Sequence, residues 1–374
     1  MVNGGGNMAQ DLFSLMQKLA PDLTEEAARR ALILERIGTL QPVGRRQLAS
    51  SLRLPEREIR NTAVRLAELG YIETNASGMR LLPAAAEILQ AADAFSRAYS
   101  GITEMEATLS ARLGVRDVVI ARGDADADER VLQDVGRRCA ERLRAMLKNG
   151  DTLAVTGGRT LAAVVQGTPT GSPLNVMVVP ARGGRGRSAE LQANTIASGL
   201  AVRLGGHYRL MHAPDRLDPT ALQEMMKLPE VSEVTDRIQR ANILLHGISD
   251  ARENMADAGL TRKEQAMLRE RGACAECFGA YFDLAGNCLL KVPSVGVDLG
   301  RLNPECQRIA AAAGASKAEA ILAVLRHDPH QVLVTDEGAA ERMLALLNEV
   351  ALPPKGMATI EDQKRREDHG EKDD

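Results

Sequence analysis

One segment of the sequence combines residue types that bind oxyanions. Residues 155–160, with the sequence VTGGRT, follow an apolar stretch typical of a strand and precede a helix-like stretch at 161–166. Gly157 and Gly158 would let the backbone approach a ligand closely, amides at the helix start would donate to it, and Thr160 adds a hydroxyl. The segment therefore indicates an anion-binding loop, although a tight strand-to-helix turn would explain the same residues taken alone.

Further segments place glycines or guanidinium, ammonium and amide groups next to strand ends or helix starts. These positions are Arg159, Arg182, Gly183, Gly184, Gln192 and Lys317. Because the carboxyl ends of neighbouring parallel strands share one edge of a sheet, we expect these groups to converge on one ligand. Guanidinium and ammonium groups favour a phosphorylated ligand, and a pocket for a sugar phosphate is the resulting interpretation.

Residues 31–80 form a basic region in an acidic chain. The region holds eight Arg, no Lys and five Glu, a balance of +3, whereas the whole chain has a net charge of -3. A helix expected at 56–69 presents donors suited to base edges, and the start of the preceding helix presents groups suited to phosphates. In chain order these donors are Arg45, Arg46, Arg57, Arg60, Asn61 and Arg65. We expect them to bind DNA, and a solvated basic helix in a protein-interaction module is the alternative.

Other chemistry is weakly represented. Cys274 and Cys277 have the spacing of zinc ligands, but their surroundings look helical and no second close pair follows, so we expect buried thiols and no metal. Glu276 and residues 336–337 could act as acid or base in an isomerase, or could accept hydrogen bonds from sugar hydroxyls. No HExxH, GxSxG or Walker A sequence occurs. We therefore expect neither a catalytic site nor a cofactor.

The elements expected in the first eighty residues form a winged helix-turn-helix. Helices are predicted at 12–31, 31–38, 45–52 and 56–69, and short strands at 71–73 and 79–82. The apolar stripe predicted for the last helix consists of Ile59, Val64, Leu66 and Leu69. Long helical runs then continue to about residue 113 and would join this module to the rest of the chain.

From residue 115 onward, short apolar stretches alternate with helix-length segments. Strands are predicted at 115–120, 152–156, 176–179, 243–245, 289–292 and 331–335. This alternation predicts an α/β class protein whose second domain is a Rossmann-like, doubly wound parallel sheet. The expected domains are a helical extension (1–30), the winged helix-turn-helix (31–82), a helical linker (83–113), an effector-binding and oligomerisation domain (114–352) and a disordered tail (353–374).

The bulk composition agrees with a multidomain globular protein. At roughly 150 residues per domain, 374 residues predict two or three domains, and 44% hydrophobic with 26% charged residues is ordinary for this class. No apolar run is long enough to span a membrane, and the first ten residues lack the pattern of an export signal. We expect a cytoplasmic protein without membrane contact, with its cysteines reduced.

In its ordered series of motifs the sequence resembles the SorC family of bacterial repressors, and within that family the branch that regulates central glycolytic genes. The resemblance covers nearly the whole chain. Besides the helix-turn-helix, the segments that carry it are VTGGRT (155–160), VPARGG (179–184), QANTIA (192–197), HGI (246–248), ECFGAYF (276–282), SVG (294–296), SKAEAI (316–321) and VTDEGAA (334–340).

The resemblance implies a repressor of glycolytic genes that binds operator DNA as a dimer or tetramer, with fructose-1,6-bisphosphate as its effector. It also implies a C-terminal domain similar to sugar-phosphate isomerases but without their activity. A sugar-phosphate isomerase or deaminase with a fused DNA-binding domain is the alternative, and turnover of a sugar phosphate would distinguish it from a regulator.

The resemblance also assigns roles to residues in the motifs. One phosphate would be held by Gly157, Gly158 and Thr160, and the sugar and the other phosphate by Arg182, Gln192, Glu276 and Lys317. The chain departs from the family pattern at two places. Arg159 stands where the family usually has Thr or Ser, and Asp257 with Ala258 stand where it usually has an arginine pair.

Overall fold

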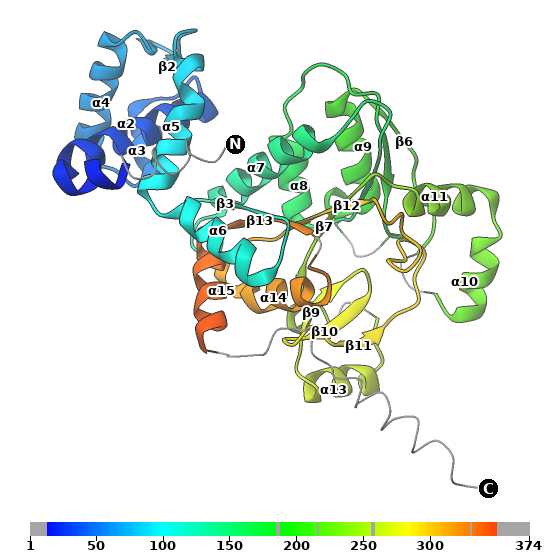
Figure 1. The fold of residues 1–374 in the computed structure, drawn as a ribbon. Helices are drawn as coiled ribbons and strands as arrows, with labels where there is room; N and C mark the ends of the chain where they lie inside the picture. The colour runs from blue at the N-terminus through cyan, green and yellow to red at the C-terminus, as the bar shows by residue number, and fades with distance from the viewer. Residues whose placement is uncertain (1–12, 185–187, 215–216, 256–258, 330, 350–374) are drawn as a thin grey trace, which may run out of the picture. The chain divides into compact units, whose positions relative to one another are not determined.

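Figure 1 shows the fold in the computed structural model, which describes residues 13–184, 188–214, 217–255, 259–329 and 331–349. The chain divides into two compact units, Met1–Glu104 and Met105–Asp374, each described here by itself. The expected disordered tail (353–374) and the departure at Asp257 and Ala258 lie outside the described residues. In the described part, no helix is both long and apolar enough to cross a membrane.

The N-terminal unit is a winged helix-turn-helix. Its elements are α2 (Pro21–Leu40), α3 (Arg45–Leu52), α4 (Glu56–Glu68), β1 (Ile72–Asn75), β2 (Gly78–Leu81) and α5 (Ala85–Tyr99). The helices enclose a small aliphatic core that includes Ile33, Ile37, Leu48 and Ile59. The boundary expected between residues 30 and 31 falls inside α2, because Ala28 and Ala31 are buried on the same side of one continuous helix.

The wing is a tight hairpin whose position depends on a glycine. Ile72 pairs with Leu81 and Asn75 with Gly78, in antiparallel register. Gly78 has φ +124°, and a Cβ placed there would lie 2.9 Å from the Val43 carbonyl carbon, so a side chain does not fit. Val43 exchanges two backbone hydrogen bonds with Met79, which attaches the wing to the loop before α3.

The buried face of α4 differs from the predicted stripe. Ile59, Thr62, Ala63 and Leu66 are buried, whereas Val64 is 55% and Leu69 44% exposed. The prediction was wrong for Val64 because five residues rotate a helix by about 500°, which places Val64 about 140° away from Ile59. Val64 therefore lies on the outer face of α4.

The C-terminal unit is built on a seven-stranded parallel sheet of order β3-β13-β12-β7-β4-β5-β6. The strands are β3 (Asp117–Ala121), β4 (Thr152–Val155), β5 (Met177–Pro180), β6 (His207–Tyr208), β7 (Ile243–Gly247), β12 (Gln307–Ala311) and β13 (Gln331–Asp336). Five of the six strands predicted by sequence lie in this sheet, which confirms the doubly wound α/β architecture.

Helices cover both faces of the parallel sheet (Figure 1). The helices of this unit are α6 (Ile102–Leu113), which begins before the boundary, α7 (Glu129–Met146), α8 (Arg159–Gly167), α9 (Ala193–Leu204), α10 (Pro219–Met226), α11 (Pro229–Gln239), α12 (Ala251–Asn254), α13 (Arg262–Glu270), α14 (Ala318–His327) and α15 (Glu337–Glu349). Aliphatic residues of α7, α8 and α9 form one buried cluster with one face of the sheet. Residues of α11 pack against the opposite face.

A second, antiparallel sheet of order β11-β10-β9-β8 corrects two predictions. Its strands are β8 (Ser249–Asp250), β9 (Ala273–Cys277), β10 (Ala280–Asp283) and β11 (Cys288–Lys291). The strand predicted at 289–292 belongs to this sheet and not to the parallel one. Cys274 and Cys277 lie on β9 and not on a helix, because pairing with β8 and β10 outweighs the weak strand propensity of Ala, Glu and Cys.

Candidate functional site

The parallel sheet reverses its winding direction between β4 and β7. From β4 the chain proceeds through β5 to β6 at one edge, and from β7 it proceeds through β12 and β13 towards the other. Such a switch point leaves a crevice outside the carboxyl ends of the two strands, where ligands bind in doubly wound folds. A cleft of about 540 Å³ lies there, lined by residues that follow β3, β4, β5, β7 and β12. That volume suits a small phosphorylated sugar.

The cleft brings together the predicted ligand residues. Of these residues, all except Gly184 line it. Gly184 instead donates its amide to the Ala213 carbonyl at 2.8 Å, and a Cβ placed on it would lie 3.9 Å from Gln192 Oε1, just behind the cleft wall. Gly157, Arg182 and Lys317, which come from three different strand ends, thus share one hollow.

The loop after β4 is shaped by its two glycines. A Cβ on Gly157 would lie 2.3 Å from the Leu191 carbonyl oxygen, so only glycine fits there. Gly158 has φ +121° and donates its amide to the same oxygen at 2.9 Å. The Gly158 amide is therefore used inside the protein, and the glycines serve to place the first turn of α8 at the cleft.

The first turn of α8 presents unused donors to the cleft. The amides of Arg159, Thr160 and Leu161 have no hydrogen-bond acceptor among the described residues, and no side chain caps this helix. The Arg159 side chain is exposed and also has no partner among the described residues. Free amides, the positive end of a helix dipole and a guanidinium together make this end of the cleft suited to a phosphate.

A buried ion pair forms part of the cleft wall. Arg182 Nη1 donates to Glu276 Oε1 at 2.7 Å, and the two side chains are only 13% and 4% exposed. The Gly279 amide donates to the same carboxylate oxygen at 2.9 Å. Burial requires such charges to be paired and hydrogen-bonded, and this pairing holds the guanidinium in a defined position beside the ligand space.

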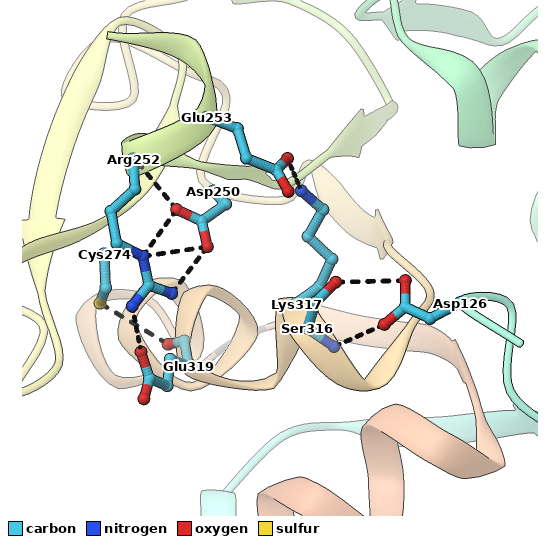
Figure 2. A network of polar contacts seen from close by, with 8 residues as sticks. All are labelled: Asp126, Asp250, Arg252, Glu253, Cys274, Ser316, Lys317 and Glu319. Atoms are coloured by element: carbon cyan, nitrogen blue, oxygen red, sulfur yellow. Dashed lines mark hydrogen bonds and ion pairs between the residues drawn. The ribbon is translucent and has the colours of Figure 1, made fainter.

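The other end of the cleft is the turn before α14, which follows β12, two strands away from β4 in the sheet, and it is rich in carboxylates (Figure 2). Lys317 Nζ forms an ion pair with Glu253, and Asp126 accepts hydrogen bonds from the Ser316 amide at 2.7 Å and the Ser316 hydroxyl at 3.2 Å. The Ala315 amide donates to Asp124 at 3.2 Å. The donors at this end are therefore already engaged, unlike those of α8.

Asp336 holds this carboxylate-rich end together. It is fully buried and accepts backbone amides from Ala125, Gly314 and Ala339 at 2.7 to 3.1 Å. Burial raises the pKa of its carboxyl, against the opposing effect of these amides. Because every hydrogen bond that Asp336 accepts in the described part of the chain comes from a backbone amide, Asp336 positions loops and does not serve as the acid or base considered from the sequence.

Two charged residues of the cleft, Asp126 and Glu253, were not predicted from the sequence. Asp126 follows the predicted strand at 115–120, so the same strand-end argument that selected Arg182 would have found it. Glu253 lies six residues beyond the end of β7, on a helix of only four residues. No local pattern marks that position.

The cysteine and histidine next to the cleft are structural. Cys277 Sγ lies 3.4 Å from His246 Nδ1, and both side chains are buried. Burial raises the pKa of the Cys277 thiol well above its ordinary value and lowers the pKa of His246. Both groups are therefore neutral near pH 7, which leaves no thiolate nucleophile. Within the described residues, no group of three or more His, Cys, Asp or Glu could hold a metal ion.

The N-terminal unit exposes the predicted DNA-binding residues on α3 and α4. Arg45, Arg46, Arg57, Arg60, Asn61 and Arg65 are all exposed. Arg46 lies 3.7 Å from Glu56, and Arg65 pairs with Glu68 at 2.9 Å. Arg57, Arg60 and Asn61 have no partner among the described residues. Val64 shares their face of α4, where an exposed apolar side chain is suited to contact a thymine methyl group.

Comparison with known proteins assigns both units. Residues 27–95 match the family described as "CggR N-terminal DNA binding domain", and residues 97–345 match "Putative sugar-binding domain". The central glycolytic genes regulator of Bacillus subtilis is 35% identical over 334 residues, which are 89% of this chain and 98% of the relative. The regulator of the same name from Priestia megaterium is 35% identical over 341 residues, 91% of this chain and 100% of the relative.

A solved structure gives the same family. The protein from Enterococcus faecalis described as a "putative SorC family transcriptional regulator" is 33% identical, with a TM-score of 0.59 over 64% of this chain and 99% of that chain. These relatives are named as regulators and not as enzymes. With a DNA-binding unit followed by a sugar-binding unit, the chain belongs to the SorC family of bacterial transcriptional regulators.

Proposed function

We propose that this protein is a repressor of glycolytic genes that binds operator DNA through its winged helices and is controlled by fructose-1,6-bisphosphate. The observation that supports this most is the convergence of α8 amides, Arg182, Gln192, Glu276 and Lys317 on one cleft at the switch point of the sheet. The relatives named central glycolytic genes regulators support the choice of target genes.

The chemistry of the cleft supports an extended sugar with a phosphate at each end. One phosphate would accept hydrogen bonds from the amides of Arg159, Thr160 and Leu161. The sugar hydroxyls would bind between Gln192 and the Arg182–Glu276 pair, because amide and carboxylate oxygens accept hydrogen bonds from hydroxyl groups. The second phosphate would lie near Lys317, the cation at the far end.

Control of DNA binding would follow from a difference in ligand affinity between two arrangements of the protein. A ligand shifts such an equilibrium only by its differential affinity for the two states. A coupling of about 1 to 3 kcal/mol would change operator affinity about 5- to 150-fold, which suffices for regulation. A homo-oligomer, dimer or tetramer, on a repeated operator and a location with the chromosome in the cytoplasm are parts of the same proposal.

Two measurements on the full chain test the proposal. Isothermal titration with fructose-1,6-bisphosphate should give saturable binding without turnover of the sugar. Fluorescence anisotropy with promoter fragments of glycolytic operons from the same genome should give salt-sensitive binding that the sugar changes at least fivefold. A protein that binds these fragments no better than unrelated DNA, or that ignores the sugar, would contradict the proposal.

A further inference from the structure

The two ends of the cleft differ in whether their donors are already used. At α8, the first-turn amides and the Arg159 side chain have no partner among the described residues. At the α14 end, Glu253 holds the Lys317 ammonium and Asp126 holds Ser316. A phosphate can therefore bind at the first end without displacing anything, whereas at the second end it meets carboxylates.

Glu253 is held at the cleft by a single contact. Its side chain is 60% exposed, and Lys317 is its only partner in the described part of the chain. Lys317 is 20% exposed, so its ammonium is largely shielded from water and depends on a nearby anion. No second contact holds the Glu253 side chain in the described part of the chain, so it can rotate into solvent once another anion takes its place at Lys317.

The backbone beneath Glu253 is anchored separately. The neighbouring Arg252 forms a two-pronged pair with Asp250, with bonds of 2.7 Å and 3.0 Å, and also pairs with Glu319 on α14 at 2.9 Å (Figure 2). The Arg252–Glu319 pair attaches α12 to α14 without using a residue that lines the cleft. The position of α12 therefore directs Glu253 at Lys317, while the Glu253 side chain itself stays free to move.

We propose that Glu253 is an internal competitor for Lys317, which makes the α14 end of the cleft the specificity-determining end for ligands with a second phosphate. The inference rests on the proposed function, since it assumes a phosphorylated sugar in this cleft. A bisphosphate gains the ammonium only after Glu253 has left, and Asp126 adds further repulsion. A monophosphate bound at α8 leaves the Glu253–Lys317 pair intact.

Repulsion between like charges supports a selective effect of Glu253 on ligands with a second phosphate. A phosphate within contact distance of Lys317 would lie close to the Glu253 carboxylate, where two like charges repel each other. Partly exposed ion pairs contribute at most about 1 kcal/mol, so the competition should lower the affinity for a bisphosphate by about 2- to 5-fold. The affinity of a ligand whose single phosphate lies at the α8 end would be lowered much less.

Glu253→Gln tests the inference, because it removes the charge and keeps the shape of the side chain. Titration calorimetry on the full chain should show fructose-1,6-bisphosphate binding to this variant about 2- to 5-fold more tightly than to the wild type. Fructose 6-phosphate should change by less than about twofold. Glu224→Gln is the matched control, since Glu224 forms an exposed pair with Lys227 at 2.6 Å that lies outside the cleft, and it should alter neither affinity.

The possible outcomes distinguish a failure of the role of Glu253 from a failure of the proposed function. If both sugars bind the wild type and Glu253→Gln changes their affinities equally or not at all, the role of Glu253 is wrong while the proposed function stands. If neither sugar binds the wild type, the proposed function fails and the inference fails with it. The thermal unfolding midpoint of Glu253→Gln without ligand should lie close to that of the wild type, because a partly exposed ion pair contributes at most about 1 kcal/mol to stability.

Discussion

Arg182 Nη1 and Glu276 Oε1 lie 2.7 Å apart and join the end of β5 in the parallel sheet to β9 in the antiparallel sheet. Both side chains are largely buried, so each charge depends on the other for its stability. The pair forms one wall of the cleft, which means that the same contact supports both the fold and the ligand site.

Arg182→Ala should destabilise the C-terminal unit as well as weaken ligand binding. Removing one member of a buried ion pair leaves the other uncompensated, which costs about 3 to 5 kcal/mol. Urea unfolding should report this loss. The double variant Arg182→Met with Glu276→Gln should recover much of the stability, and a double variant as unstable as Arg182→Ala would contradict the pairing argument.

Gly157→Ala should abolish tight binding of fructose-1,6-bisphosphate. The added Cβ would lie 2.3 Å from the Leu191 carbonyl oxygen, so the loop that carries the α8 amides must move. We expect affinity to fall by about tenfold or more, which corresponds to a loss of 1.4 kcal/mol. Gly300→Ala is the control, because its Cβ would make only an ordinary contact, 3.7 Å from Asp298. Equal affinities of the two variants would refute this role for Gly157.

Arg60→Ala and Asn61→Ala should each weaken binding to the operator fragment by about 1 to 3 kcal/mol, or about 5- to 150-fold. Both side chains are exposed on the outer face of α4 and have no partner among the described residues. Arg45→Ala should instead weaken binding to all DNA sequences alike. It should also reduce the slope of log affinity against log salt concentration by about one. Anisotropy titrations at several salt concentrations separate these effects.

The exposed Arg269 on α13 provides the control for these variants. Arg269→Ala removes the same charge from the C-terminal unit and should leave operator affinity unchanged. If Arg60→Ala and Arg269→Ala behave alike, the α4 face does not read DNA.

Stability should fall as the pH drops below about 6.5, because of His246. Burial lowers the pKa of His246 below its ordinary value of 6.5, so the unfolded chain takes up a proton before the folded one does. The stability that the neutral imidazole contributes is therefore complete above pH 6.5 and is lost as the pH falls towards the folded-state pKa. The loss can reach about 1.4 kcal/mol per pH unit.

Urea unfolding at pH 7.0, 6.0 and 5.5 measures this slope. His246→Gln should flatten the slope over this interval, whereas the same change at the exposed His207 should preserve it. An unchanged slope in His246→Gln would assign the pH dependence to other groups.

Local sequence was sufficient for much of the architecture and of the site. The glycines at 157 and 158, placed between an apolar strand and a helix, are sufficient to predict a tight strand-to-helix loop, because glycine conformation and helix-start amides are local properties. That this loop binds an anion stays a prediction. The exposed arginines of α4 are predictable for the same reason, since helical periodicity separates them from Ile59 and Leu66. The expected doubly wound sheet also follows, from strands alternating with helices.

Long-range contacts decided what the sequence left open. Cys274 and Cys277 lie on a strand because β8 and β10 flank them, and β12 lies inside the parallel sheet, between β13 and β7, although its Gln307–Ala311 sequence is followed by helix-favouring alanines. Glu253 reaches Lys317 across 64 positions of the chain, and Arg182 reaches Glu276 across 94. Residue types along the chain determine which groups can bind an anion, but only tertiary packing determines which of those groups are already neutralised by one another.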